Sequence, residues 1–442
     1  MCDCESNRSM DVKTPRNVYL SGFYKRSFAF YTIKNRMPVI ITSLLDNLAR
    51  NKLKLAEKYE EEAKEEIKTV IGQLSKLKYE IQTNKPLKLL SSQAADAKIY
   101  NEYITRQANE EGHATYFHTI WLLAECYMYR RIWQIFETMS VLKNFDPFQD
   151  KKEESFFTAL PLIEQMGKYL WDSIHDSTTP SEDEFVQFMK LNLWGNKCDL
   201  SLSLGKVTEE NTLFDISSLD KQILSDYSTD IWKAISACDS SSDIVDIVFD
   251  NAGYEVFTDL CLADYMIAKQ LAKTIRLYVK TIPWFISDVM THDFHWMLQQ
   301  LKSHENHVLQ NLGERWQSYI DNGTWLIVES DFWTLPFDYT YMARVDQNLY
   351  KQLAEAKLAI FKGDLNYRKL FGEKNWDPTT SVDQALQNFN PTKLAILRTI
   401  KADIVCGLEE GIAEKIEAED PKWMETGNWG LIQYSNKIVE IK

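Results

Sequence analysis

Apolar residues in the first half of the chain recur every three or four positions, which is the spacing of one face of an α-helix. The clearest run starts near Ala56, carries charged residues between its apolar ones, and ends before Pro86. The stretch 120–136 is apolar and aromatic nearly all round, which predicts a helix buried between others. The first half is therefore predicted to be helical. The apolar positions of the first run are Tyr59, Ala63, Ile67, Val70, Leu74, Leu77 and Ile81.

The second half has a different pattern, because short runs of β-branched and aromatic residues alternate with helix-like stretches. This alternation is typical of a largely parallel sheet that helices cover on both faces. We therefore predict an α/β protein, in which an N-terminal all-helical domain precedes an α/β/α sandwich with a Rossmann-like sheet. The predicted parts are a poorly ordered extension over 1–27, a helical domain over 28–215 and an α/β domain over 216–442. The runs interpreted as strands are 243–251, 274–283, 324–330, 357–364 and 393–401.

Composition narrows the classes of partner. The chain has 442 residues, and 50 Lys and Arg against 64 Asp and Glu give a formal net charge of −14. Nucleic acids and anionic membranes need a basic face, so neither partner is expected, and any phosphate must be bound by local positive charge. The seven cysteines are odd in number and scattered, and no secretory signal or membrane-spanning stretch is visible. We therefore expect a protein of the cytosol or the nucleus.

Polar residues follow several of the predicted strands, and ligands of parallel sheets bind outside the carboxyl ends of the strands. Asp250 and Asn251 follow the first run and Asp288 follows the second, and all three offer the oxygen ligands that hard divalent cations prefer. The loop at 362–369 and the segment 398–401 add cationic and amide groups after two later runs. Each group alone also fits an N-cap, an Asx-turn or a solvated helical turn. Together they suit a divalent cation that bridges to a phosphate.

Four strings of the second half occur together with three of the first. They are FDNAGYE, KTIPWFISD, FKGDLNYRKL and RTIK in the second half, and FAFYTIKNRMP, WLLAECYMYRRI and LWGNKCDLSLS in the first. Their joint occurrence in this order resembles the damage-control phosphatase family, in its sugar-phosphate phosphatase subfamily, over nearly everything after residue 27. The resemblance implies a helical domain joined to an α/β domain that uses a divalent metal. One vertebrate member of the subfamily is also named as a protein-carboxyl, or acidic-residue, methyltransferase.

Carried over residue by residue, the resemblance implies that Asp250, Asn251 and Asp288 bind the metal. It also implies that Asp250 and Asn251, together with Lys401, carry the catalysis. The chain keeps the Arg-Thr-x-Lys signature of the subfamily but has Glu373 where the family pattern has Asp, a change that keeps the charge. The residues implied to bind the substrate are Asp250, Asn251, Glu255, Asp364, Leu365, Asn366, Tyr367, Arg368 and Lys401. The residues implied to brace the site from behind are Asn196, Asp199 and Arg398.

The resulting hypothesis is a metal-dependent phosphatase of metabolite damage control, with 216–442 as its metal-binding catalytic domain. It would hydrolyse a small phosphorylated metabolite, such as fructose 1-phosphate or fructose 6-phosphate, with Mn²⁺, Co²⁺, Ni²⁺ or Mg²⁺. Lys401 would neutralise charge on the phosphoryl oxygens. Whether Asp250 attacks the phosphorus or positions a water molecule stays open.

Two other functions were weighed against this hypothesis. The first is S-adenosylmethionine-dependent methylation of glutamate carboxylates on an acidic protein. No Gly-x-Gly-x-x-Gly follows a predicted strand, and the negative charge of the chain would repel an acidic partner. The second is a non-enzymatic scaffold, which the complete set of implied metal ligands disfavours.

Overall fold

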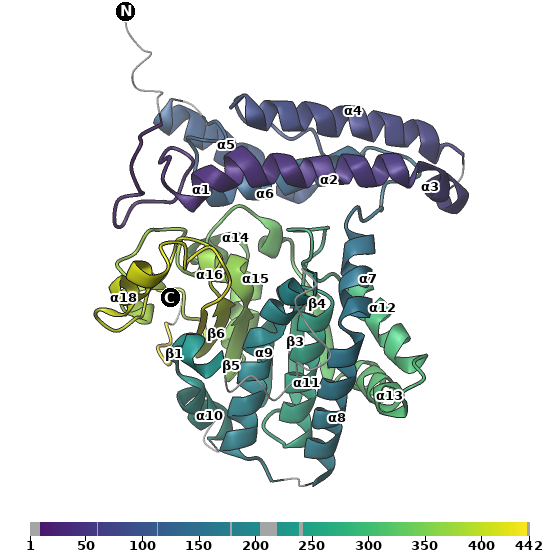
Figure 1. The fold of residues 1–442 in the computed structure, drawn as a ribbon, viewed down its shortest axis with the longest axis vertical. Helices are drawn as coiled ribbons and strands as arrows, with labels where there is room; N and C mark the ends of the chain where they lie inside the picture. Colours follow the sequence, from purple (N-terminus) through teal and green to yellow (C-terminus); the bar gives the residue numbers. More distant parts are fainter. Residues whose placement is uncertain are drawn as a thin grey trace, which may run out of the picture. The chain divides into compact units, whose positions relative to one another are not determined.

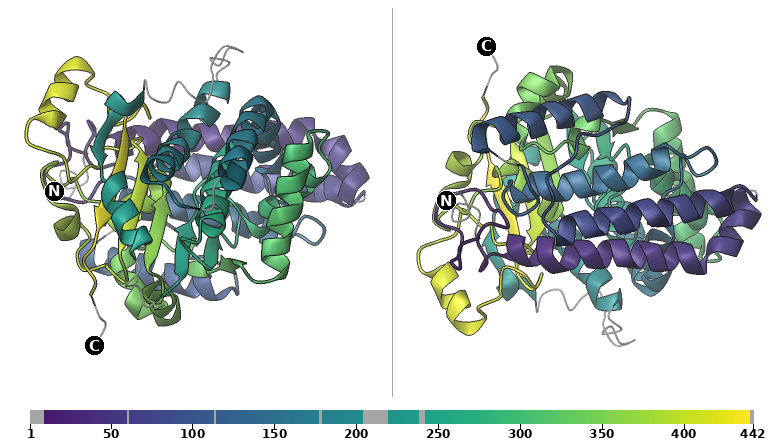
Figure 2. Two further views of the ribbon diagram at one scale, coloured as in Figure 1. Left: turned by 90° about the horizontal axis from the view of Figure 1, so that it is seen from below. Right: turned by 90° about the horizontal axis from the view of Figure 1, so that it is seen from above.

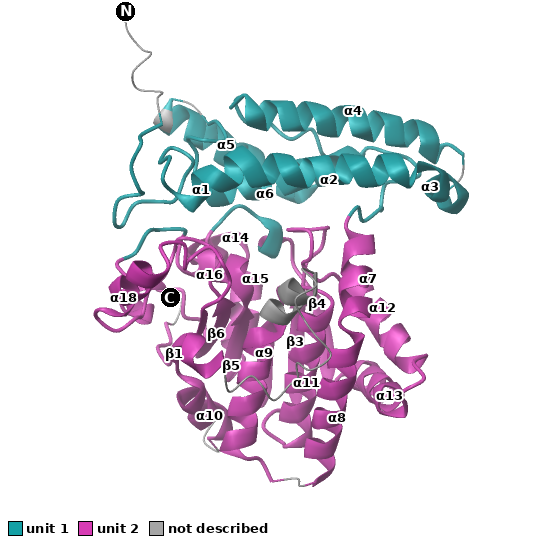
Figure 3. Ribbon diagram, in the orientation of Figure 1, with its two compact units in different colours: residues 1–147, 333–337, 373–376 teal, residues 148–332, 338–372, 377–442 magenta. Residues whose placement is uncertain are grey.

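The computed structural model divides into two compact units (Figure 3). Unit 1 comprises residues 1–147, 333–337 and 373–376, and unit 2 comprises residues 148–332, 338–372 and 377–442. Between them the units contain the two architectures predicted above, one helical and one built on a sheet. The residues that the structure describes are 9–59, 61–112, 114–176, 179–203, 219–237 and 242–439, without the side chains of 111 and 196–203.

Unit 1 is built from helices (Figure 1). The apolar run that starts near Ala56 is divided between two helices, and its members from Ala63 to Ile81 are all buried. The stretch predicted as a buried helix also forms one, and most of its side chains are buried. The elements of unit 1 are α1 (Phe28–Tyr31), the π-helix η1 (Thr32–Arg36), α2 (Met37–Arg50), α3 (Lys52–Tyr59), α4 (Ala63–Gln82), α5 (Ala95–Glu111) and α6 (Trp121–Glu137).

Residues 9–27 pack within unit 1, where the sequence predicts a poorly ordered extension. The N–H of Asn17 donates to the carbonyl of Asn375 at 2.8 Å, and the N–H of Leu20 donates to the carbonyl of Glu373 at 2.8 Å. The side chain of Leu20 is fully buried. The prediction is therefore wrong for these residues, because the partners that order them lie far along the chain and leave no local pattern. Residues 1–8 lie outside the described residues.

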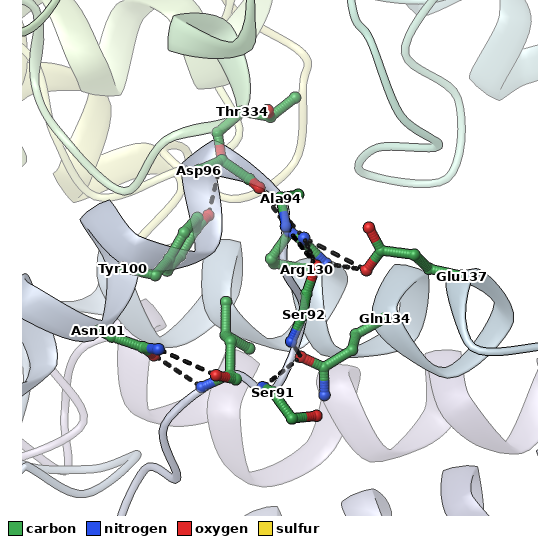
Figure 4. Close-up of polar contacts among 11 residues, drawn as sticks. Ser91, Ser92, Ala94, Asp96, Tyr100, Asn101, Arg130, Gln134, Glu137 and Thr334 are labelled. Carbon is green, nitrogen blue, oxygen red and sulfur yellow. Dashed lines mark hydrogen bonds and ion pairs between the residues drawn. The ribbon is translucent and has the colours of Figure 1, made fainter.

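A buried ion pair joins α5 to α6 (Figure 4). Nη2 of Arg130 donates to Oδ1 of Asp96 at 3.1 Å and to Oγ of Ser92 at 3.0 Å, while Nε donates to the other oxygen of Asp96. Gln134 accepts hydrogen bonds from the N–H groups of Ser91 and Ser92 at 2.9 and 3.1 Å. These contacts hold the extended segment before α5 against α6.

Replacing Arg130 by Met should destabilise the protein by about 3–5 kcal/mol, because it leaves the buried carboxylate of Asp96 without its cation. The denaturant midpoint of the full chain would measure this loss. Lys68→Met is the matched control, since Lys68 pairs with Glu65 on the exposed face of α4 and such pairs contribute about 0–1 kcal/mol. Equal midpoints for both variants would show that the Arg130 pair gives no net stabilisation.

Unit 2 contains a seven-stranded sheet in the order β1-β7-β6-β5-β2-β3-β4. The neighbours from β6 to β4 pair in parallel, β7 runs antiparallel to β6, and β1 is parallel to β7. Helices cover both faces of the sheet (Figure 2). The predicted α/β class with a largely parallel sheet is therefore confirmed. The strands are β1 (Ile223–Asp226), β2 (Ile244–Val248), β3 (Thr274–Val279), β4 (Trp325–Glu329), β5 (Leu358–Lys362), β6 (Leu394–Thr399) and β7 (Gly430–Ser435).

Three helices that precede the predicted domain boundary at residue 215 belong to the sheet-containing unit. Helices α8 and α9 pack with α11 in one apolar core that also includes residues of β2, β3 and β5. The compact division falls between Pro147 and Phe148, because helical periodicity does not show what a helix packs against. The helices of this unit are α7 (Gln149–Thr158), α8 (Leu160–Asp176), α9 (Glu182–Ser203), α10 (Ser228–Ser236), α11 (Tyr254–Ala268), α12 (Thr291–Lys302), α13 (His307–Asp321), η4 (Tyr339–Tyr341), α14 (Met342–Val345), α15 (Gln347–Ala354), α16 (Gly363–Leu370), α17 (Val382–Ala385) and α18 (Ile412–Glu419), and η3 (Asp331–Thr334) crosses from this unit into unit 1.

None of the described helices combines the length and the apolar character needed to cross a membrane. Among the described residues, Cys126, Cys261 and Cys406 are buried free thiols. These thiols agree with the expectation of reduced cysteines that their scattered positions suggested.

Candidate active site

The parallel pairing of β5, β2 and β3 brings the ends of these strands together. Val248, the last residue of β2, pairs with Phe361 of β5 and with Tyr278 of β3. Asp250 follows two residues later, so it lies level with the first residue of α16 on one side and with Lys280 on the other. The side chain of Asp250 is only 6% exposed. The predicted position of Asp250 at the carboxyl edge of the sheet is thus the position that the structure gives it.

The carboxylate of Asp250 lies against the backbone of Gly363, the first residue of α16. A Cβ atom at position 363 would lie 1.9 Å from Oδ2 of Asp250, a distance that no pair of atoms tolerates. Gly363 also has a φ of +85°, in the left-handed region that favours glycine. Because Gly363 has no Cβ, the backbone at the start of α16 can lie directly against the carboxylate of Asp250.

A loop after β3 returns Asp288 to Asn251. The two residues form an isolated antiparallel bridge. The N–H of Val289 donates to the carbonyl of Asp250 at 3.0 Å, and the N–H of Ala252 donates to the carbonyl of Ser287 at 2.7 Å. Backbone hydrogen bonds therefore fix Asp288 beside the residues that follow β2, although Asp288 itself comes nine residues after β3 ends.

The turn in this loop uses an unusual backbone. Phe285 and Ile286 have φ values of 44° and 73°, which residues with a Cβ rarely adopt, and a β-branched residue least of all. The fully buried Trp284 anchors the turn, and its carbonyl accepts a hydrogen bond from the N–H of Asp288 at 3.1 Å. Strain of this kind is retained where the surroundings hold it in place, and it gathers at functional sites.

Asn251 links the acidic groups of the site. Its Nδ2 donates to Oδ2 of Asp250 and to Oε2 of Glu255, both at 2.8 Å. Its Oδ1 accepts a hydrogen bond from the hydroxyl of Ser287. On the other side, Nζ of Lys280 lies 3.2 Å from Oδ2 of Asp288. Two carboxylates therefore accept from one amide group, and a buried lysine pairs with a third carboxylate, that of Asp288.

The pKa values of Asp250 and Asp288 lie above the usual value of an aspartate. Burial and the neighbouring Glu255 and Asp288 raise the pKa of Asp250 well above its usual value, and Lys280 and Lys401 only partly oppose this rise. Burial likewise raises the pKa of Asp288 to about 6, against the effect of Lys280. Several acidic groups are thus buried close together, an arrangement that disfavours their ionised forms. A cation among them would relieve the repulsion.

The donor set fits a divalent cation. Two buried carboxylates, those of Asp250 and Asp288, and the amide oxygen of Asn251 are all hard oxygen ligands. The amide nitrogen of Asn251 donates to two carboxylates and its oxygen accepts from the hydroxyl of Ser287, so the second lone pair of that oxygen could bind a metal. The chemistry and charge of these three residues therefore agree with the metal ligands that the sequence predicted.

The predicted substrate residues 365–368 point into the protein interior. Nδ2 of Asn366 donates to the carbonyl of Lys362 at 2.7 Å, and its Oδ1 accepts from the hydroxyl of Tyr339. The hydroxyl of Tyr367 accepts from the N–H of Cys406 at 3.2 Å. Leu365 and Arg368 are buried as well. Residues 363–366 form the first turn of α16, whose N–H groups have no partner within the helix.

The Arg-Thr-x-Lys string is pinned to the start of α16. Nε of Arg398 donates to Oδ1 of Asp364 at 2.7 Å, and its Nη2 donates to the carbonyl of Ala402 at 3.0 Å. The same Oδ1 accepts from the N–H of Lys401 at 3.1 Å. Arg398 is therefore a buried brace, while the side chain of Lys401 stays half-buried. The predicted braces Asn196 and Asp199 fall on side chains outside the described part of the structure.

Sequence reasoning missed Lys280 and assigned no role of its own to Lys362. Lys280 directly follows β3 and Lys362 ends β5, and both side chains are only 1% exposed. They lie at the ends of the two strands that flank β2, and each pairs with an acidic residue of the site. A charged residue directly at the end of an apolar strand was visible in the sequence. Its partner was not, because the pairing depends on which strands are neighbours.

Two surface grooves of the described structure contain none of these residues. One, of about 920 Å³, runs along α5 in unit 1 and is lined by Ser91, Lys98, Asn101 and Arg106 among others. The other, of about 570 Å³, lies at the end of α8 in unit 2, near Trp171 and Glu184. The candidate site is therefore separate from these two grooves.

Fold and site together describe an α/β protein with a buried, carboxylate-rich centre at the carboxyl ends of parallel strands. Residues 32–416 match the sequence profile of the damage-control phosphatase ARMT1-like domain. The chain therefore belongs to the damage-control phosphatase ARMT1-like family, which confirms the resemblance inferred from its motifs.

Full-length relatives support this membership. The chain is 40% identical over 435 residues to the Homo sapiens protein named Damage-control phosphatase ARMT1, covering 95% of this chain and 98% of that protein. It is 39% identical over 432 residues to the Danio rerio protein of the same name, covering 94% and 96%. A solved structure of a DUF89 family protein from Pyrococcus horikoshii covers 79% of this chain and 93% of that chain, with 15% identity and a TM-score of 0.42.

Proposed function

We propose that the chain is a metal-dependent phosphatase of metabolite damage control, and that small sugar phosphates are its substrates. The observation that carries the proposal is that the buried carboxylates of Asp250 and Asp288 and the amide of Asn251 lie together, with Asp250 against the first turn of α16. Oxygen ligands for a cation lie here next to backbone N–H groups, which suit an anion. Membership of the damage-control phosphatase family supports the same chemistry.

In this proposal Asp250, Asn251 and Asp288 hold a divalent cation, either Mn²⁺, Co²⁺, Ni²⁺ or Mg²⁺. Such a cation supplies Lewis-acid polarisation of a phosphoryl group. The first-turn N–H groups of α16 and the ammonium group of Lys401 bind the phosphoryl oxygens and stabilise the charge that develops on them. Asp364 fixes the backbone of Lys401, and Arg398 fixes Asp364.

Residues 365–368 would contribute to substrate binding by keeping the shape of the site, without direct side-chain contacts to the substrate. Their side chains are buried, and those of Asn366 and Tyr367 hold neighbouring backbone groups in place. Glu255 is also buried, and it orients Asn251. We place the activity in the cytosol or the nucleus, where cysteines such as the buried thiols of this chain stay reduced.

Phosphate release tests the proposal directly. The full chain is incubated with fructose 1-phosphate or fructose 6-phosphate and one of the four cations, and inorganic phosphate is measured over time. Chelation by EDTA should abolish the release, and added Mn²⁺ should restore it. Asp288→Asn should need more metal for half-maximal activity, because the site loses one anionic ligand.

Phosphate release that EDTA leaves unchanged would overturn the metal-dependent mechanism. The competing function is tested in parallel with labelled S-adenosylmethionine and an acidic protein as methyl acceptor. Methyl transfer without any phosphate release would favour the carboxyl methyltransferase.

A further inference from the structure

We propose that Lys362 is a positioning residue for the metal site, an inference that rests on the proposed function. Its ammonium group holds Glu255, and Glu255 holds the side-chain amide of Asn251, so that the amide oxygen is left for the cation. Lys362 itself touches neither the cation nor the substrate in this arrangement.

The first step of this chain of contacts is the placement of Lys362. As the last residue of β5 it lies beside β2, and its side chain is turned into the interior. Its Nζ lies 2.9 Å from Oδ1 of Asp259 and 3.6 Å from Oε1 of Glu255, and it donates to the carbonyl of Asn192 at 3.0 Å. One ammonium group therefore joins two carboxylates of α11 to the backbone of α9.

The second step is that the two oxygens of Glu255 contact different partners. Oε1 faces Lys362, and Oε2 accepts the hydrogen bond from Nδ2 of Asn251. The ion pair thus fixes the carboxylate on one side while the other side fixes the amide. An amide can rotate by 180° and present nitrogen where oxygen is needed, and the hydrogen bond to Glu255 acts together with those to Asp250 and Ser287 to keep the oxygen of Asn251 in place.

The third step is electrostatic. Burial alone would lower the pKa of Lys362, but Asp259 and Glu255 outweigh burial and raise that pKa, so the amine stays charged. Without this charge, two carboxylates would remain buried side by side with no cation between them, at a high cost in free energy. Glu255 would then lose the ion pair that holds it, and Asn251 would lose one of the partners that orient it.

The test measures the affinity of the full chain for Mn²⁺ alone, by titration calorimetry, in wild type, Lys362→Met, Glu255→Gln and the double variant. Groups that orient metal ligands typically contribute about 10- to 100-fold in affinity, so we expect a weakening of that size in Lys362→Met. If Lys362 acts through Glu255, the double variant should bind Mn²⁺ no more weakly than the weaker of the two single variants. The electron paramagnetic resonance spectrum of bound Mn²⁺ should change in the same variants.

Asp264→Asn separates this role from loss of stability. Asp264 is a fully buried carboxylate of α11 that pairs with Arg315 on α13, so its loss should lower the thermal midpoint without changing Mn²⁺ affinity. If Lys362→Met does not fold, the same measurement is made on the double variant Lys362→Met, Asp259→Asn. This variant also removes the carboxylate of Asp259, which would otherwise stay buried without the cation of Lys362.

Several outcomes are distinguishable. Unchanged Mn²⁺ affinity in Lys362→Met, or additive losses in the double variant, would overturn the inference and leave the proposed function standing. Wild-type protein that binds no Mn²⁺ and releases no phosphate would instead overturn the proposed function. A weakening confined to the Lys362 and Glu255 variants would support both.

Discussion

Asp250→Asn should lower the rate of phosphate release by about 10³-fold, the size of loss expected when a group that organises charge at the reacting centre is removed. The same variant should unfold at the same temperature as the wild type, or at a higher one, when both are freed of metal. The reason is that Asp250 is a buried carboxylate beside Glu255 and Asp288, and their repulsion raises its pKa. A neutral amide removes that repulsion but keeps an oxygen that can accept from Asn251. Activity is therefore expected to fall without any loss of stability.

Asp264→Asn is the matched control for this experiment. Asp264 is equally inaccessible, but it accepts hydrogen bonds from Arg315 and Trp316 at 2.9 Å and from Tyr319 at 3.0 Å. Replacing it weakens a satisfied network, so the thermal midpoint should fall while phosphate release stays near the wild-type rate at a temperature where the variant is folded. Wild-type activity in Asp250→Asn would remove Asp250 from the catalytic site.

Gly363→Ala is expected to produce the second largest effect, and it acts through geometry alone. The added methyl group would overlap the carboxylate of Asp250 at 1.9 Å, and the backbone at φ +85° disfavours any Cβ. Either the carboxylate or the start of α16 must move. We expect destabilisation of about 1–3 kcal/mol from overpacking, together with a loss of phosphate release of at least about 10²-fold, since misplacement by about 1 Å has an effect of this size.

Two other glycines serve as controls, because an added Cβ meets no neighbouring atom at either position. Gly323 has φ +79° with nothing within 4 Å of an added Cβ, so Gly323→Ala measures backbone strain alone. Gly72 lies in α4, also with open space, and Gly72→Ala should stabilise its helix by roughly 0.5–1 kcal/mol. Neither variant should change phosphate release. If Gly363→Ala loses no more activity than Gly323→Ala, the contact between Gly363 and Asp250 does not matter for function.

The strands of the central sheet could be predicted, and those at one edge could not. The apolar runs that form β2, β3, β5 and β6 are buried between layers of helices, so their composition identifies them. β4 lies at the other edge with only Trp325 buried, and its apolar run still identified it. β1 has only four residues, none of them buried, and β7 begins with glycine and includes glutamine. Their strand character comes from pairing with each other and with β6, which no local pattern records.

The division of the chain into units was likewise beyond a local pattern. Residues 333–337 and 373–376 belong to unit 1 although they are surrounded in sequence by unit 2. Helices α7 to α9 have the same periodicity as those of unit 1 and yet pack with the sheet. Periodicity depends on which residues of a helix are buried, whereas unit membership depends on what buries them.

The sequence by itself determined the family and the fold class, because these depend on residue types in order along the chain, and it named candidate residues for the site. Only the tertiary structure decided how those residues are used. It turned Asn366 and Tyr367 inward, made Arg398 a brace, placed Gly363 under the carboxylate of Asp250, and brought Lys280 and Lys362 to the acidic groups. The directions, contacts and burial of these side chains arise from long-range pairing of strands and loops. A site that concentrates buried charge depends on that pairing more than on any single motif.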